Sequence, residues 1–355
     1  MQGYTHFFPI AYSATDVTVY QQDVVIHRAT GTAYQETVGT TKVWHIYVGT
    51  KCKADYGDIR FTKSDGTTEL NYYLWPDYTS SQARFTVKLE GTTNAGQIMV
   101  WYGNSGAVTT SNGDATFPLF DDFTGSSIDT TKWITHIGTD GSPSITVANG
   151  EAIFTSGSTG SGARYVAIES KQLFGSGYQM VGKLRSSATG NRPQRYTIIG
   201  FGATYYSYNV NQLGDLVAAP GGAYWRDAES NSAYWGTVPS GGQGSGTWTR
   251  SEKLVSTSYQ IFSSSMRSDG IDWDIDGTTY SYDSNPITGE IPVVVGIDAH
   301  RTTSGDQTTD IVDWVLVRAY SATPPAATAF GPEQAPGSLH HVQGVVFGSA
   351  NMMVI

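Results

Sequence analysis

The residues with the clearest chemical potential are three aspartates at alternate positions, Asp272, Asp274 and Asp276. Alternate side chains of a β-strand point to one face, so a strand here would present the three carboxylates together, opposite Ile271, Trp273 and Ile275. Glycoside hydrolysis needs two carboxyl groups at a fixed separation, one as acid and one as nucleophile. We nevertheless predict a solvated face, because the Asp-Gly pair at 276 and 277 is typical of a hairpin turn.

A second candidate is a pair of Ala-Tyr-Trp triplets separated by a polar run. Flat aromatic rings beside Asn, Asp and Arg supply what a pyranose needs, a face for stacking and hydrogen bonds for its hydroxyl groups. The alternative is that these large rings pack in the core or at the rim of a β-sandwich. The sequence predicts a glycan-binding site at Tyr224, Trp225, Asp227, Asn231, Tyr234 and Trp235.

Other reactive residue types give weaker signals. The seven histidines are spread through the chain, and we expect them not to cluster. The adjacent His340 and His341 could chelate a transition metal, although a solvated tail is the simpler interpretation. Cys52 is the only cysteine, which excludes an internal disulfide and a thiolate metal cluster. The chain contains no Gly-x-Ser-x-Gly elbow, Walker loop or Rossmann fingerprint.

The composition indicates which elements must position these residues. The chain has 355 residues, of which 39% are hydrophobic and 15% charged, with abundant glycine and tyrosine. No long stretch has the helical period, which favours an all-β fold in two domains. The net charge of -10, with scattered Lys and Arg, is unlike the basic face of a nucleic-acid-binding protein. We therefore expect no nucleic acid partner and no membrane insertion.

Three blocks near the start of the chain carry a family resemblance: residues 56–62, 69–73 and 99–104. In this order and spacing they resemble a family of β-sandwich domains of unknown function from surface proteins of archaea and bacteria and from proteins of their viruses. The Gly-Asp-Ile-Arg-Phe-Thr core is the most specific part, and the resemblance covers residues 1 to 115. It implies extracellular or virion display. We predict a β-sandwich over 1–104 and a linker over 105–116.

Four later segments resemble, in order, the concanavalin-like jelly roll of lectins, laminin-G-type modules and laminarinase or lichenase glycoside hydrolases: 117–133, 147–154, 270–277 and 310–320. The resemblance implies a jelly-roll domain over 117–320. In laminarinase-type enzymes the catalytic acids lie on one mid-domain strand, in a Glu-x-Asp-x-Glu or Glu-x-Asp-x-x-Glu pattern. The matching segment here, 195–202, contains no acid. On that ground we predict that the protein is not an enzyme.

The same resemblance implies a structural calcium ion. Its ligands would be the Asp313 carboxylate and the main-chain carbonyls of Asp122 and Gly150. A hard cation prefers oxygen ligands and would join the first and last strands of the sandwich. The alternative is that Asp313 caps a backbone amide or faces water.

The end of the chain changes character. Residues 321–355 are predicted to be a Pro-rich linker, centred on Pro324 and Pro325, followed by an apolar C-terminal arm over 342–355. Proline donates no hydrogen bond to a sheet, so we expect the linker to leave the sandwich. The arm either packs on its own domain or docks on a neighbouring subunit.

Our sequence-based hypothesis is a non-catalytic structural and adhesive protein displayed on a virion, as a fibre, spike or decoration protein. Its partners would be a cell-surface glycan and other copies of itself or other virion or surface proteins, and we expect a homo-oligomer. The N-terminus has no signal-peptide pattern, which favours a virion surface over an extracellular or cell-surface location. The alternatives are a secreted glycoside hydrolase or carbohydrate-binding module, and an archaeal or bacterial surface-layer or filament protein.

Overall fold

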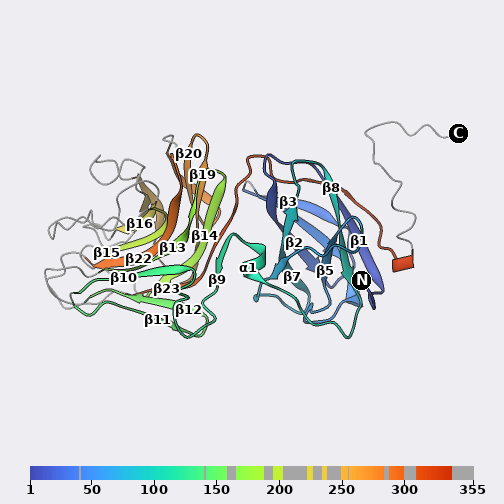
Figure 1. Cartoon of the computed structure of the whole chain (residues 1–355), viewed down its shortest axis with the longest axis horizontal. Coiled ribbons are helices and arrows are strands. Elements are labelled where there is room, and N and C mark those ends of the chain that lie inside the picture. The colour runs from blue at the N-terminus through green and yellow to red at the C-terminus, as the bar shows by residue number, and fades with distance from the viewer. Residues whose placement is uncertain are drawn as a thin grey trace. The chain divides into compact units, whose positions relative to one another are not determined.

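The computed structural model confirms the all-β fold class (Figure 1). It describes residues 1–39, 41–139, 141–157, 165–187, 195–202, 222–226, 234–237, 249–254, 256–283, 288–299 and 309–337. In these ranges the helical structure consists of a short α-helix, α1 (Gly113–Thr116), a 3-10 helix, η1 (Gly49–Lys51), and 3-10 residues at 336–337. No helix in the described ranges is long and apolar enough to cross a membrane.

The chain divides into two compact units. The first comprises Met1–Asn112 together with the described residues from Thr323 onward, and the second is Gly113–Ala322. The second unit is therefore an insertion in the sequence of the first. This differs from the predicted order of domain, linker, domain and tail, because 323–337 returns to the first unit.

The first unit is a sandwich of two sheets. One has the strand order β24-β1-β8-β5 and the other β3-β4-β2-β7-β6. Their apolar faces meet in a core that includes Val24, Trp44, Phe61 and Phe85, each fully buried. The strands are β1 (His6–Tyr12), β2 (Val19–His27), β3 (Tyr34–Val38), β4 (Thr41–Tyr47), β5 (Arg60–Lys63), β6 (Tyr72–Leu74), β7 (Gln82–Glu90), β8 (Gly96–Tyr102) and β24 (Ala327–Phe330).

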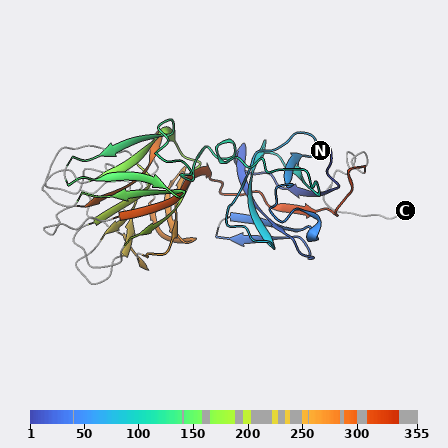
Figure 2. The ribbon, with the colours of Figure 1, turned by 90° about the horizontal axis from the view of Figure 1, so that it is seen from below.

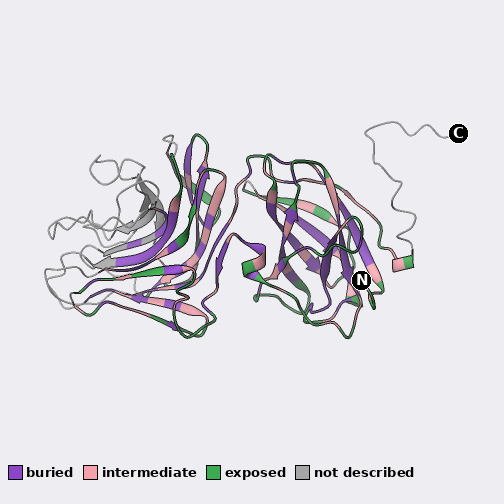
Figure 3. Cartoon of the chain, in the orientation of Figure 1, coloured by how far each residue is buried: buried purple, intermediate pink, exposed green. Residues whose placement is uncertain are grey.

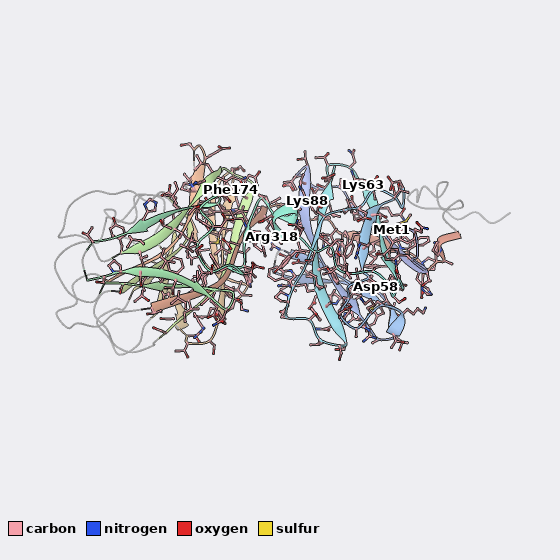
Figure 4. The ribbon with its side chains drawn as sticks, turned by 60° about the horizontal axis from the view of Figure 1, so that its bottom comes forward. Met1, Asp58, Lys63, Lys88, Phe174 and Arg318 are labelled. Atoms are coloured by element: carbon pink, nitrogen blue, oxygen red, sulfur yellow. The ribbon has the colours of Figure 1, made fainter. Side chains whose placement is uncertain are left out.

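The Gly-Asp-Ile-Arg-Phe-Thr block leads into β5 and has a structural role. Asp58, labelled in Figure 4, is 1% exposed and accepts hydrogen bonds from the backbone amides of Lys53 (2.9 Å) and Gly103 (2.8 Å). Arg60 is also buried and donates to the carbonyls of Gly57, Ile59 and Val108. Buried charges are stable when they are hydrogen-bonded in this way. The block thus ties the entry of β5 to neighbouring loops.

The segment that we expected to be an exit linker instead contributes a strand to the first unit. β24 pairs antiparallel with β1, with Ile10 opposite Phe330, and lies among the blue strands of that unit in Figure 2. Glu333 then forms an ion pair with Lys51 (2.5 Å) and lies 3.3 Å from Nε2 of His6. Residues 323–337 do leave the jelly-roll unit, but the prediction of a linker is wrong for 327–330, which form a strand of the first unit. Pro324 and Pro325 precede this strand, and β24 is an edge strand that needs only one hydrogen-bonded side.

The second unit is the predicted jelly-roll sandwich. One sheet has the order β10-β13-β22-β15-β16-β17-β18, and the other β11-β12-β23-β14-β19-β20-β21 with β9 beside β23. The strands are β9 (Leu119–Asp121), β10 (Trp133–Ile137), β11 (Ser144–Ala148), β12 (Glu151–Thr155), β13 (Val166–Phe174), β14 (Tyr178–Ser186), β15 (Arg195–Phe201), β16 (Gly222–Arg226), β17 (Tyr234–Thr237), β18 (Thr249–Leu254), β19 (Gln260–Arg267), β20 (Gly270–Ile275), β21 (Thr278–Asp283), β22 (Ile291–Ala299) and β23 (Thr309–Ala319).

Alternation along these strands defines an inner and an outer face for each sheet. Ile168, Ile199 and Ile297 of the seven-stranded sheet meet Phe154 and Met180 of the eight-stranded sheet in one core. Buried residues accordingly follow the strands of both sheets (Figure 3). Residues at the alternate positions, such as Glu169 and Asp272, lie on the outer faces.

Candidate functional site

The aspartates of β20 lie where the sequence predicts. Ile271, Trp273 and Ile275 belong to the core, so Asp272 and Asp274 are on the outer face of the eight-stranded sheet. Burial raises the pKa of Asp272, against the opposing effect of Arg267, whose Nε lies 3.3 Å from the carboxylate. Asp274 accepts hydrogen bonds from the hydroxyls of Ser263 (3.2 Å) and Thr279. Both carboxylates are thus occupied by neighbouring side chains.

Asp276 has a different role from the other two aspartates. Its φ of 53° and the φ of 78° at Gly277 form the tight turn between β20 and β21, as the Asp-Gly pair predicts. Its carboxylate accepts a hydrogen bond from the amide of Ile261 at 2.9 Å. The expectation that three carboxylates share one strand face is therefore confirmed for two of them only.

A group of ionic contacts lies on the same outer face, and sequence analysis did not identify it. The Lys183 ammonium is 2.6 Å from the Asp313 carboxylate, and Arg185 is 3.6 Å from Glu151. Tyr259 donates a hydrogen bond to Glu151. Its burial, with that hydrogen bond, raises the pKa of Tyr259 to about 12. These residues come from four strands or loops, so only the sheet order reveals their contact.

The predicted calcium ligands are brought together in part. Asn149 and Gly150 turn between β11 and β12 with φ values of 57° and 75°, and a Cβ at Gly150 would lie 3.8 Å from the carbonyl oxygen of Asp122. Asp313 lies on the adjacent β23, but its carboxylate pairs with Lys183. No three His, Cys, Asp or Glu side chains converge as metal ligands among the described residues. A cation here would depend on main-chain oxygens and would compete with an ammonium group.

The four aromatic residues of the predicted glycan-binding site lie on the paired strands β16 and β17, and the backbone register assigns the tryptophans and the tyrosines to opposite faces of the sheet. The backbone register places Trp225 opposite Trp235 and also opposite Thr197. Thr197 is buried and donates a hydrogen bond to Asp310 of the other sheet, so this row belongs to the inner face. Tyr224 and Tyr234 occupy outer-face positions by alternation. Asp227 and Asn231 lie outside the described residues.

The outer face of the seven-stranded sheet carries an acid and a base that sequence analysis missed. His136 on β10 lies 3.1 Å from Glu169 on β13, through Nε2 and Oε2, and the two side chains are 17% and 20% exposed. Across the sheet, Glu169 is opposite Val294, Val294 is opposite Gly200, and Gly200 is opposite Gly222, so these positions form one row of the outer face. Alternation around the buried Trp133 and Ile168 could have indicated these positions, but not their contact.

Comparison with known proteins gives a partial family match. The model of a domain of unknown function, DUF2341, matches residues 55–136, which is less than half of the chain and extends from the first unit into the second. This supports the predicted resemblance to a domain family of unknown function, whereas the Gly-Asp-Ile-Arg-Phe-Thr block is not shown to be its signature. No curated protein is similar enough in sequence to count as a relative.

Solved structures share the jelly-roll fold at low identity. They include a β-1,3-glucanase from Mycobacterium marinum, with 12% identity, 57% of this chain and 98% of that chain covered, and a TM-score of 0.41. The catalytic domain of a laminarinase from Thermotoga petrophila has 13% identity, 57% and 96% coverage and a TM-score of 0.42. A pseudo β-1,3-glucanase and immunostimulatory antigen of Mycobacterium tuberculosis has 11% identity, 57% and 99% coverage and a TM-score of 0.40.

These comparisons correct the prediction that the protein is not an enzyme. Structures similar to it are glycoside hydrolase family proteins and β-1,3-glucanases. The prediction rested on the absence of an acid in 195–202, but one strand does not supply every carboxylate of a sheet face. Glu169, two strands away from β15 in the sheet order, is on that outer face.

Proposed function

We propose that the second unit recognises a carbohydrate through the outer face of its seven-stranded sheet. The observation that carries this proposal is the register of that face: the positions of Tyr224 and Tyr234 lie on one side, and the His136–Glu169 pair lies on the other. Aromatic and polar groups on one surface are the combination that sugar recognition uses.

The spacing of the sheet supports this assignment. Three strand intervals separate β13 from β16, which corresponds to about 14 Å at the usual interval between strands. The positions of this face on the two intervening strands include Gly200, Gly296 and the buried Val294. An extended oligosaccharide could span this distance from the acidic to the aromatic side.

A binding assay with a panel of soluble β- and α-glucans tests this proposal. Replacing Tyr224 or Tyr234 with Ala is expected to weaken binding about 3- to 10-fold, since an aromatic contact contributes about 0.5–1.5 kcal/mol. The matched control is Tyr78→Ala, which removes a tyrosine that is 39% exposed in the first unit. Equal affinity of all three variants would contradict the assignment of the site.

Hydrolysis of the bound glycan is the second candidate function. The specific observation is Glu169, which places a carboxylate on this face, 3.1 Å from the imidazole of His136; carboxylates and imidazoles are the usual general acids and bases. Release of reducing ends from the same glucans measures this activity. Glu169→Gln is expected to remove it while the unfolding temperature stays close to that of the wild type; activity that survives the substitution would exclude Glu169.

Display on a virion is the location we propose for this activity, with an extracellular or cell-surface location as the alternative. Its support is the resemblance of the N-terminal blocks to surface and viral proteins. Mass spectrometry of purified virions tests this location directly. Recovery of the protein in secreted or cell-wall fractions, and not in virions, would favour the alternative.

A further inference from the structure

Two histidines that are distant in sequence meet in the first unit. β2 and β4 pair in parallel, with Val25 opposite His45 and His27 opposite Tyr47. Nε2 of His27 lies 3.0 Å from Nδ1 of His45, and the ring centroids are 5.3 Å apart. The expectation that the histidines do not cluster is therefore wrong for this pair.

Glu36 determines which nitrogen of His45 faces His27. Its Oε2 lies 3.2 Å from Nε2 of His45. A carboxylate accepts the proton of an imidazole N–H, so the neutral ring carries its proton on Nε2 and directs the lone pair of Nδ1 toward His27. Metal-ligating histidines are commonly oriented in this way, by a carboxylate at the ring nitrogen that does not bind the ion.

Two tyrosines fix the planes of the imidazole rings. Tyr34 stacks on His45 at 4.4 Å with an interplanar angle of 8°, and Tyr47 stacks on His27 at 4.5 Å with an angle of 13°. His45 is 7% exposed.

We propose that His27 Nε2 and His45 Nδ1 bind a divalent transition metal of the copper and zinc group. Metal–nitrogen bonds of about 2.0–2.1 Å at a tetrahedral angle separate the two nitrogens by about 3.3 Å. The observed separation is 3.0 Å, so a shift of a few tenths of an ångström admits the ion. Imidazole suits these metals better than it suits calcium or magnesium.

Solvent would complete the coordination. In the described part of the chain no three potential metal-ligating side chains converge, so the protein supplies two ligands and Glu36 acts through His45. The competing interpretation is a hydrogen bond between two neutral imidazoles with no metal. The two interpretations differ in whether an added ion binds here.

Calorimetric titration of the full-length protein with Cu²⁺ and with Zn²⁺ tests the proposal. Because His340 and His341 are adjacent and could bind the same ions, the titration uses a His340→Gln/His341→Gln background. In that background, His27→Gln and His45→Gln are expected to abolish binding. Glu36→Gln is expected to weaken it 10- to 100-fold, the usual effect of removing such a carboxylate.

His136→Gln is the matched control, since it removes a histidine paired with a carboxylate in the other unit. It should leave the affinity unchanged. Circular dichroism establishes that each variant is folded, and the electron paramagnetic resonance spectrum of the Cu²⁺ complex should show two nitrogen ligands. The proposal is overturned by absence of binding in the tail background, or by a folded His27→Gln variant that binds as tightly as its parent.

Discussion

At the scale of single residues, the structure separates buried charges that hold the fold from polar groups available for function. Asp58 and Arg60 form hydrogen bonds with backbone groups of neighbouring loops, so these two charged side chains stabilise the fold. His27 and His45 are partly buried, with their nitrogens directed at each other. The structural role of Asp58 and Arg60 explains the Gly-Asp-Ile-Arg-Phe-Thr block, whereas no sequence pattern indicates the contact between His27 and His45.

Asp58→Ala is expected to lower the free energy of unfolding by about 2–6 kcal/mol. The substitution leaves two partly buried N–H groups without their acceptor, each costing up to about 1–3 kcal/mol. Differential scanning calorimetry measures the effect. Asp55→Ala is the control, because its side chain is 58% exposed and it accepts one local hydrogen bond from Gly57. Similar losses for both variants would refute a special role for Asp58.

The histidine pair predicts a pH dependence of stability. Burial lowers the pKa of His27 and of His45, with His45 adding to the effect at His27 and Glu36 opposing it at His45. The unfolded chain then binds more protons below its unperturbed value of about 6.5. Stability should therefore decrease as pH falls from that value toward the lower folded pKa values.

Melting curves at about pH 7.5 and 5.5, on either side of the unperturbed histidine pKa, measure this decrease. A His27→Gln/His45→Gln variant should show a smaller difference between the two conditions. An identical difference in that variant would assign the pH dependence to other groups.

At the scale of elements, strand ends and edges determine the possible contacts. The turn at Asn149 and Gly150 brings β12 back beside β23, with Ala152 opposite Val312. The carbonyl of Asp122 lies near the same turn. The predicted calcium site lies at this junction of early and late strands, where Lys183 already forms an ion pair with Asp313.

If calcium binds at this junction, a chelator is expected to lower the unfolding temperature of the second unit. An ion at a hundredfold excess over its dissociation constant stabilises the folded state by about 2.7 kcal/mol. Asp313→Ala should remove the sensitivity to chelator, while Asp129→Ala, which alters an exposed turn, should retain it. An unchanged melt of the wild type with chelator would contradict the site.

At the scale of the whole molecule, the second unit is inserted between β8 and β24 of the first. The chain therefore passes through the jelly roll before it completes the first sandwich. Ala327 and Phe330 pack against the core of the first unit, so β24 contributes both a sheet edge and apolar contacts.

Two truncations separate the roles of the C-terminal region. Ending the chain at Ala322 removes β24 and the ion pair of Glu333 with Lys51 and should lower the unfolding temperature of the first unit. Ending it at Gly337 keeps these contacts, so its stability should match that of the full chain.

If the predicted arm over 342–355 mediates a homo-oligomer, light scattering should give a smaller mass for the Gly337 truncation. Equal monomeric masses would exclude that role.

Much of the fold follows from local sequence patterns. Alternation in 270–275 and the Asp-Gly pair after it predict the strand, its buried face and its turn, because both depend on residues that are neighbours in sequence. The same alternation rule could have placed Tyr224 and Trp225 on opposite faces. The all-β class likewise follows from composition and periodicity, whereas the jelly roll is expected from a resemblance to known families.

What the tertiary structure decides is which strands become neighbours. His27 and His45 are 18 residues apart and meet because β2 and β4 pair in parallel, while Glu169 meets His136 across β10 and β13. Ser13 bonds to Ala326 over a separation of 313 residues, where a Pro-rich segment indicated a linker. Strand pairing depends on which distant apolar faces fit one core and which edges remain unpaired. A local sequence pattern specifies neither the fit between distant apolar faces nor the edges that remain unpaired. The side-chain clusters that could bind a ligand are therefore visible only in the assembled sheets.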